Sequence, residues 1–157
     1  MSESDAVDYS SDRKSETDIR SRYIDPALFH DPDGPKWDWD LVDQEHTYTD
    51  GEIVIEGRRG VRKTPKKPDY VLLFESNYCA AIIEAKKQYK TFKDGMGQAI
   101  EYAKELGCNF AYSTNGKAID KENNTGIYEY DFTTKQYNVR GDFPSRDELL
   151  KRDPRTK

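Results

Sequence analysis

Residues 68–87 read PDYVLLFESNYCAAIIEAKK, two apolar runs joined by a short polar break. The runs YVLLFE (70–75) and YCAAIIEA (78–85) are almost continuously apolar, which is typical of central strands that are covered on both faces. Ser76 and Asn77, which separate them, suit a two-residue turn. This stretch therefore predicts a pair of hairpin-connected strands in the middle of a sheet.

Three charged residues flank the apolar runs at the end far from the turn. Counting outward from Ser76 and Asn77 places Asp69 directly opposite Glu84, with Cβ atoms roughly 5 Å apart. Lys86 is two residues beyond Glu84 and so points to the same face. Directly opposed like charges destabilise a sheet unless they are compensated. The cluster is therefore either a cross-strand ion cluster at the sheet edge or a metal site.

A metal site at this position would have a definite chemistry. Mg²⁺ prefers oxygen ligands and typically takes one or two carboxylates while keeping several waters. Such an ion neutralises charge on a phosphate and acidifies an attacking water, and a neighbouring lysine orients that water or stabilises developing charge. The pattern predicts phosphodiester hydrolysis with Asp69 and Glu84 as metal ligands and Lys86 beside them.

The segments on the N-terminal side predict a helix, a loop and a hairpin. Residues 1–14 are rich in Ser and Asp and predict a disordered tail. Ser15 is a suitable N-cap for a helix that Pro26 interrupts or restarts. Residues 31–40 predict a loop, and Trp37 and Trp39 within it are expected to pack into the core. The turn pair Asp50-Gly51 predicts a β-hairpin.

The segments on the C-terminal side complete a mixed sheet flanked by helices. A helix is predicted over about 97–106 and ends at Gly107, which suits the position after a helix. A strand is predicted over 109–114, a hairpin over 126–139, and a short last helix capped by Ser145 with Glu148. This order of elements predicts an α/β fold.

The charge of the chain is unevenly distributed. The net charge is −5, yet residues 58–93 hold ten basic against three acidic residues, a local net charge of +7. A basic stripe in an acidic protein is typical of a DNA-binding face, although a solvated charged loop has the same composition. Six basic residues that precede the first central strand are predicted to contact phosphates: Arg58, Arg59, Arg62, Lys63, Lys66 and Lys67.

Other features of the sequence indicate where in the cell the protein is expected. No apolar run approaches the length of a membrane span, and the first residues have no apolar segment typical of a secretory signal. Cys79 and Cys108 are the only cysteines, and we expect both to be reduced and structural. These features predict a cytoplasmic protein without a membrane partner.

Several motifs together resemble one nuclease family. Pro68-Asp69 and Glu84-Ala85-Lys86 resemble the signature of the PD-(D/E)xK nuclease fold. Within that superfamily, SETDIRSRYIDPAL, KKPDYVLLF, AAIIEAKK, GMGQAIEYAKEL, FAYSTNG and FPSRDELLKR resemble segments of the N-terminal nuclease domain of type I restriction enzyme R subunits. The resemblance covers roughly residues 15–152, with Pro68 where that family usually has alanine. It implies a restriction-endonuclease-like α/β fold.

The resemblance also implies residue roles. Asp69, Glu84 and the carbonyl of Ala85 would bind Mg²⁺, Lys86 would be the catalytic lysine, and Glu16 would assist metal or water binding. Gln98 and Tyr102 would contact DNA near the cleaved phosphate. The alternatives are that Glu16 complements a helix dipole and that Gln98 and Tyr102 are an ordinary half-buried polar pair on one helix face.

The resemblance implies partners beyond this chain. No Gly-x-x-x-x-Gly-Lys-Ser/Thr element is present, so an ATP-driven motor is expected only in a longer polypeptide of which residues 15–157 are the nuclease domain. The expected partners are double-stranded DNA and the modification and specificity subunits of a restriction complex. A stand-alone repair or type II-like nuclease of the same superfamily is an alternative, as is a catalytically silent DNA-binding or assembly module.

Overall fold

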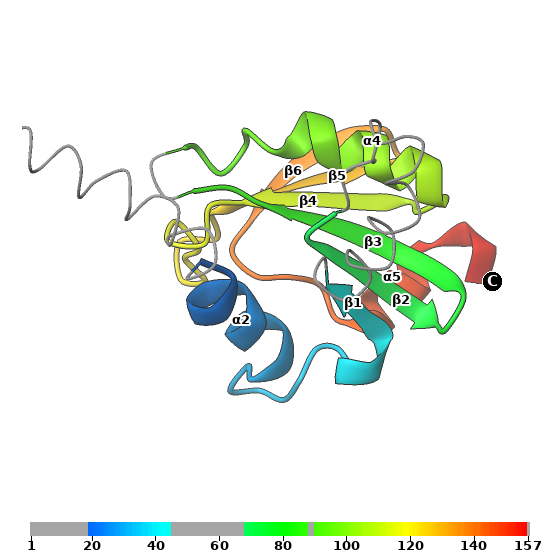
Figure 1. Ribbon diagram of the computed structural model, residues 1–157, viewed down its shortest axis with the longest axis horizontal. Coiled ribbons are helices and arrows are strands. Elements are labelled where there is room, and N and C mark those ends of the chain that lie inside the picture. Colours follow the sequence, from blue (N-terminus) through cyan, green and yellow to red (C-terminus); the bar gives the residue numbers. More distant parts are fainter. Residues whose placement is uncertain (1–18, 45–67, 88–89, 157) are drawn as a thin grey trace, which may run out of the picture.

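The structure is a computed structural model that describes residues 19–44, 68–87 and 90–156. Six strands form one sheet in the order β1-β2-β3-β4-β5-β6 (Figure 1). Their bounds are β1 Val42–Gln44, β2 Tyr70–Glu75, β3 Tyr78–Ala85, β4 Phe110–Thr114, β5 Ile127–Asp131 and β6 Gln136–Arg140. β3 and β4 are parallel and the other neighbouring pairs are antiparallel, so the predicted mixed sheet is confirmed.

The β2–β3 hairpin has the register that the sequence predicts near the candidate site. Tyr70 pairs with Ile83, and Val71 pairs with Ile82. At the other end Glu75 pairs with Tyr78, which leaves Ser76 and Asn77 as the turn. The register shifts between Leu72 and Glu75, but this irregularity lies on the turn side of the hairpin and does not displace the end where Asp69 and Glu84 lie.

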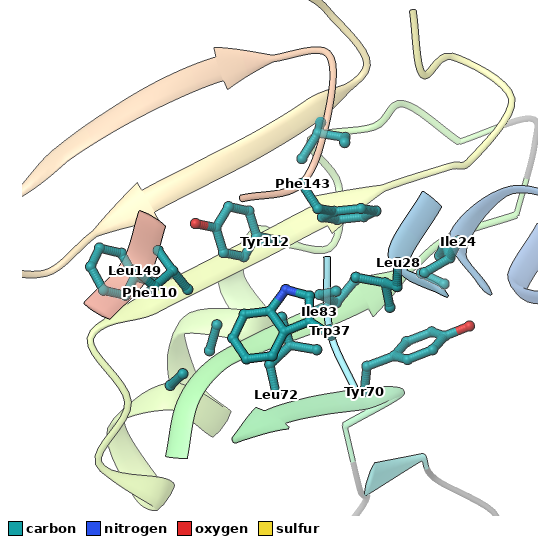
Figure 2. Packing of buried hydrophobic residues seen from close by; sticks show 14 of the residues in the cluster. Ile24, Leu28, Trp37, Tyr70, Leu72, Ile83, Phe110, Tyr112, Phe143 and Leu149 are labelled. Atoms are coloured by element: carbon teal, nitrogen blue, oxygen red, sulfur yellow. The ribbon is translucent and has the colours of Figure 1, made fainter. Parts of the chain in front are cut away.

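Helices cover both faces of the sheet. α4 (Met96–Leu106) lies on one face, which we call the α4 face, where Val71, Ile82 and Ala111 pack against it. On the opposite face lie the π-helical turn η1 (Arg20–Ile24), α2 (Asp25–Phe29) and α5 (Arg146–Arg152). Their core includes Trp37, Tyr70, Tyr112 and Phe143 (Figure 2). The short helices η2 (Trp39–Leu41) and η4 (Pro154–Thr156) complete the described elements.

The predicted helix ends agree with the structure where they are described. Gly107 follows α4 with a φ of 76°, a left-handed conformation that glycine adopts without steric cost. The Ser145 side chain accepts a hydrogen bond from the backbone N–H of Glu148 at 3.1 Å and so caps α5. Pro26 lies in the first turn of α2, where its missing N–H costs nothing. Ser15 and the predicted hairpin around Asp50-Gly51 lie outside the described residues.

Two sequence predictions about individual side chains are wrong. Cys79 and Cys108 are not reduced in this structure but form a disulfide, with Cα atoms 5.3 Å apart. The pairing is possible because β3 and β4 are neighbours, a proximity that the spacing of the cysteines does not reveal. The second wrong prediction concerns Trp39, which is 63% exposed and contacts the ring of Phe29 instead of packing into the core. Trp37 is buried as expected, and its indole N–H donates to the carbonyl of Pro144.

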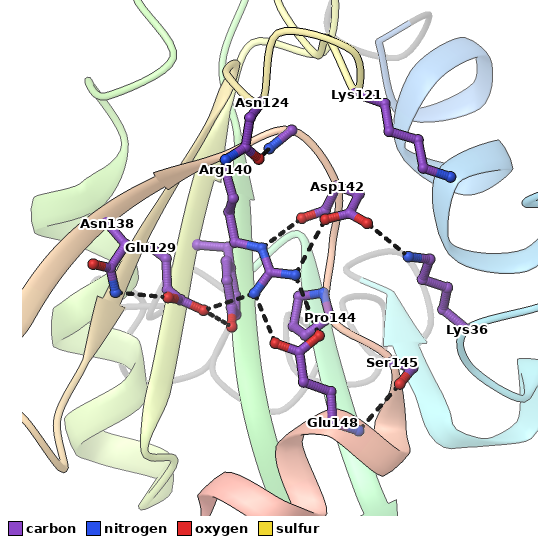
Figure 3. A network of polar contacts seen from close by, with 12 residues as sticks. Lys36, Lys121, Asn124, Glu129, Asn138, Arg140, Asp142, Pro144, Ser145 and Glu148 are labelled. Carbon is purple, nitrogen blue, oxygen red and sulfur yellow. Dashed lines mark hydrogen bonds and ion pairs between the residues drawn. The ribbon is translucent and has the colours of Figure 1, made fainter.

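A buried charged network connects α5 to the sheet. Glu129 of β5, only 2% exposed, accepts hydrogen bonds from Tyr112 and Asn138 and forms ion pairs with Arg140 and Arg152. Arg140 also reaches Asp142 and Glu148 (Figure 3). Burial alone would raise the pKa of Glu129, but the hydrogen bonds from Arg152, Tyr112 and Asn138 hold it below its ordinary value. The network therefore holds an ionised carboxylate inside the protein.

No helix in the described part of the chain is long and apolar enough to cross a membrane.

Candidate active site

Asp69 and Glu84 are in direct contact at the open end of the β2–β3 hairpin. The backbone N–H of Asp69 donates to Glu84 Oε1 at 3.1 Å. The carboxylate of Asp69 in turn accepts from the backbone N–H of Ala85 through Oδ2 at 2.7 Å. Each carboxylate thus accepts a backbone hydrogen bond from the opposite segment, which fixes both groups at one end of the sheet.

Burial gives Glu84 an unusual protonation equilibrium. Glu84 is only 6% exposed to solvent. Burial is the largest cause and the negative charge of Asp69 the second, and together they raise the pKa of Glu84 from 4.5 to about 9. The hydrogen bond from the Asp69 N–H and the positive charge of Lys86 act in the opposite direction. The Asp69–Glu84 pair therefore disfavours two negative charges without an added cation, as expected of a carboxylate pair built to hold one.

Lys86 lies on the same side of the site as Glu84. Its backbone N–H bonds to the carbonyl of Thr114 at 2.9 Å, which continues the β3–β4 pairing just past the end of β3. Its side chain approaches Gly95, the residue before α4: a Cβ built at Gly95 would lie 3.3 Å from Lys86 Cε and 3.2 Å from Glu84 Cβ. The structure thus brings together Asp69, Glu84 and Lys86.

Gly95 and Ser113 are site neighbours that the sequence alone did not identify. The backbone N–H of Gly95 donates to Ser113 Oγ at 2.9 Å, and Ser113 is opposite Glu84 in the β3–β4 pairing. A Cβ at Gly95 would come within 2.8 Å of that Ser113 oxygen. The start of α4 can therefore lie against the carboxylates only because residue 95 has no side chain.

Arg20 is a second residue that sequence reasoning missed. Its Nη1 lies 3.3 Å from Asp69 Oδ1, an ion pair between η1 and the start of β2 that is mostly shielded from solvent. The hydroxyl of Tyr70 in β2 donates to Asp25 Oδ1 at 2.5 Å, and Asp25 directly follows the π-helical turn that carries Arg20. No motif pointed to Arg20, because its role depends on how η1 packs against the sheet.

Gln98 and Tyr102 lie on one face of α4, as their spacing predicts. Gln98 Nε2 is 3.5 Å from the hydroxyl of Tyr102, and Tyr102 is largely buried against the α4 face of the sheet. The structure thus confirms their shared face. Their contact with DNA stays a prediction.

The other predicted site residues lie outside the described residues. These are Glu16 and the basic residues Arg58, Arg59, Arg62, Lys63, Lys66 and Lys67. Within the described ranges, no three His, Cys, Asp or Glu side chains are grouped to hold a metal ion. The metal-binding role of the Ala85 carbonyl also stays a prediction.

The residues present fit Mg²⁺ on chemical grounds. They provide carboxylate oxygens, which hard cations prefer. They also provide a buried pair in which burial and then the charge of Asp69 raise the pKa of Glu84, and a divalent cation would favour the ionised form of both carboxylates. The guanidinium of Arg20 already supplies one positive charge to Asp69, so a metal ion would share this carboxylate with Arg20 or displace it.

The fold resembles that of a protein of known structure. The fragment structure of a putative HsdR subunit of a type I restriction enzyme from Vibrio vulnificus YJ016 matches 87% of this chain and 25% of that chain. The TM-score is 0.58 and the sequence identity is 29%. The α/β fold, with its mixed six-stranded sheet and flanking helices, is therefore that of a type I restriction enzyme subunit fragment.

A curated relative points to the same subunit. The type I restriction enzyme EcoAI endonuclease subunit of Escherichia coli is 33% identical over 136 residues. The match covers 86% of this chain but only 16% of that relative. The chain is thus similar, over most of its own length, to a small part of a type I restriction enzyme endonuclease subunit. No protein-family profile matches the chain.

Proposed function

We propose that this chain is the nuclease module of a type I restriction enzyme's endonuclease subunit and hydrolyses phosphodiester bonds of DNA with Mg²⁺. The observation that carries the proposal is the convergence of Asp69, Glu84 and Lys86 at one end of the sheet, with Asp69 and Glu84 in direct contact. These are the residues whose pattern resembles the PD-(D/E)xK signature, and that resemblance supports the proposal. The homology to an endonuclease subunit supports the same reading.

The chain's own groups have distinct tasks in this mechanism. Asp69 and Glu84 provide carboxylate oxygens as ligands for the metal ion. The N–H of Ala85 fixes the Asp69 carboxylate in place. Mg²⁺, bound by these carboxylates, would neutralise phosphate charge and acidify the attacking water. The ammonium of Lys86 lies where it can orient that water or stabilise the charge that develops on the phosphate. α4 covers one side of the site through Gly95.

The proposal extends to partners and to ATP. The chain covers a small part of its relative, so sequence recognition and ATP-driven motion of DNA are assigned to other subunits and to a motor outside these residues. Double-stranded DNA and the modification and specificity subunits are the proposed partners, and the compartment is the cytoplasm. Residues 1–157 alone should bind no ATP in a calorimetric titration.

The test is plasmid cleavage by the complete endonuclease subunit assembled with its partner subunits. Glu84→Gln keeps an acceptor for the Asp69 N–H but removes the charge, so it should abolish cleavage with Mg²⁺ while ATP hydrolysis by the assembly persists. Glu75→Gln is the matched control, because Glu75 is exposed at the opposite end of the hairpin. Cleavage by Glu84→Gln at the wild-type rate would disprove the assignment.

A further inference from the structure

An aromatic surface lies on the same face of the sheet as the candidate active site. Cross-strand pairing joins Glu84 to Ser113, Ser113 to Tyr128, and Tyr128 to Val139. Directly paired residues point to the same face of a sheet, and neighbouring strands are about 4.8 Å apart. Tyr128 therefore lies on the α4 face, roughly 10 Å from Glu84 across two strand spacings.

The rings on this surface are packed against one another. Tyr137 is stacked on Tyr128 with centroids 5.3 Å apart and an interplanar angle of 21°, and it also contacts Tyr130 at 4.7 Å. Phe132 meets Tyr130 edge-on, and Phe92 meets Tyr128 edge-on. We call the five rings the aromatic ridge: Phe92, Tyr128, Tyr130, Phe132 and Tyr137.

The ridge is open to solvent at the edge strand β6. Tyr137 is 52% exposed, and Val139, on the same face of β6, is 39% exposed. Among the described strands, β6 has a neighbour on one side only. These neighbouring side chains leave aromatic and apolar surface in contact with solvent, where a ligand could cover it.

Lys93 places one positive charge directly at the ridge, although the exposed Asp94 follows it in the chain. The ammonium of Lys93 lies 4.9 Å from the centroid of the Tyr128 ring and 5.9 Å from that of Phe92, where it is exposed. The acidic side chains of β5, Glu129 and Asp131, belong to the opposite face, where Arg152 forms ion pairs with both. Phosphates approaching the ridge would therefore meet a cation and no carboxylate from β5.

We propose that the aromatic ridge binds unpaired bases of a nucleic-acid strand whose backbone runs on to the candidate active site. Aromatic side chains beside basic groups bind single strands through base stacking, which tolerates any sequence because every base has a π-face. In a duplex the base faces are already covered by neighbouring pairs, so a stacking surface distinguishes unpaired from paired DNA. This inference rests on the proposed nuclease function and adds the strand state that its substrate has near the cleaved bond.

The test measures binding without cleavage. Fluorescence anisotropy of labelled oligothymidine with residues 1–157 in EDTA, at low salt, reports affinity independently of any metal. Tyr137→Ala should weaken binding roughly tenfold, the loss of about one stacked base, whereas Tyr137→Phe should bind as tightly as wild type. Trp39→Ala is the matched control. Trp39 is an exposed aromatic residue outside the ridge (63% exposed, against 52% for Tyr137), and its loss should leave the affinity unchanged.

Two further measurements separate stacking from general charge attraction. Lys93→Gln should reduce the slope of log affinity against log salt by about 0.7, the value for one phosphate contact on a single strand. An unlabelled duplex of equal length should compete at least tenfold less well than the unlabelled single strand. Equal competition by duplex, or wild-type affinity of Tyr137→Ala, would overturn the proposal.

In the longer endonuclease subunit, a neighbouring part of the polypeptide could cover the ridge instead of nucleic acid. The same variants made in that longer subunit test this alternative. If Tyr137→Ala weakens oligothymidine binding there as well, the ridge is open to nucleic acid; no effect in the longer subunit would overturn the proposal. Failure of the nuclease function is a separate outcome. It would appear as cleavage by Glu84→Gln, whatever the effect of Tyr137→Ala on binding.

Discussion

The backbone N–H of Asp69 donates to the carboxylate of Glu84 at 3.1 Å, so the two acidic residues are fixed against each other. This bond favours the ionised form of Glu84, yet burial and the charge of Asp69 outweigh it and raise the pKa of Glu84 to about 9. Folding therefore places a carboxyl group where it holds a proton at neutral pH unless a cation replaces that proton. The stability of the metal-free protein should show this competition.

The first prediction concerns that pH dependence. A carboxyl group with a pKa near 4.5 when unfolded and about 9 when folded contributes its full stability below pH 4.5, and this contribution is lost as the pH rises toward 9. Urea unfolding in EDTA should thus show wild-type stability falling between pH 5 and pH 9. Glu84→Gln, which cannot ionise, should flatten this fall.

The control for this prediction is Glu75→Gln, which removes an exposed carboxylate at the other end of the hairpin and should keep the wild-type pH dependence. Millimolar Mg²⁺ should restore stability at pH 8.5 in the wild type and not in Glu84→Gln, since a ligand that binds only the folded state stabilises it. An identical pH slope in wild type and Glu84→Gln would contradict the burial argument.

Arg20 supplies a second prediction. Its guanidinium pairs with Asp69 at 3.3 Å and so competes with any other cation for that carboxylate. Arg20→Gln should tighten Mg²⁺ or Mn²⁺ binding about two- to fivefold, the equivalent of a partly shielded ion pair worth about 0.5–1 kcal/mol. Calorimetric titration of the two proteins measures this directly. Weaker metal binding by Arg20→Gln would mean that Arg20 holds the site together instead of competing for it.

Gly95 supplies a third prediction. A side chain there would come within 2.8 Å of Ser113 Oγ and 3.2 Å of Glu84 Cβ, so Gly95→Ala must displace α4 or the site. Cleavage by the assembled subunit should fall by at least tenfold, because small displacements of catalytic groups are costly. Gly97→Ala is the matched control, since a Cβ at Gly97 meets nothing within 4 Å and alanine favours the helix. Equal activity of the two variants would show that the site tolerates the displacement.

The sequence predicted the part of this site that local geometry determines. A two-residue turn at Ser76-Asn77 and the two-residue period of strands were sufficient to place Asp69 beside Glu84 and Lys86 on the same side, and the helix ends followed from Gly107 and Ser145. The chain motifs could not predict contacts between distant segments. Arg20 with Asp69, Gly95 with Ser113, and Cys79 with Cys108 each depend on tertiary packing.

Two failures have their own physical causes. The short strand β1 (Val42–Gln44) was not predicted, because three residues without an alternating apolar pattern become a strand only by pairing with β2. Trp39 was expected to pack into the core together with Trp37. Only Trp37 belongs to the buried cluster, whereas Trp39 begins the short helix η2 and is exposed.

The last prediction concerns Glu129, whose carboxylate forms ion pairs with Arg140 (Figure 3) and with Arg152. Glu129→Ala would leave two arginines and the Tyr112 hydroxyl without their shared partner in a buried environment, so unfolding free energy should fall by about 3 kcal/mol. Urea denaturation at pH 7 measures the loss. Glu122→Ala, a change in an exposed side chain on the loop before β5, should stay within about 0.5 kcal/mol of wild type.

The pH dependence of this stabilisation has the opposite sign to that of Glu84. Because the pKa of Glu129 is held below its ordinary value, its contribution to the unfolding free energy is present above that ordinary value and is lost as the pH falls through the folded pKa. The difference between wild type and Glu129→Ala should therefore shrink in acid; a difference that stays constant down to pH 3 would mean that packing, not charge, holds α5 to the sheet.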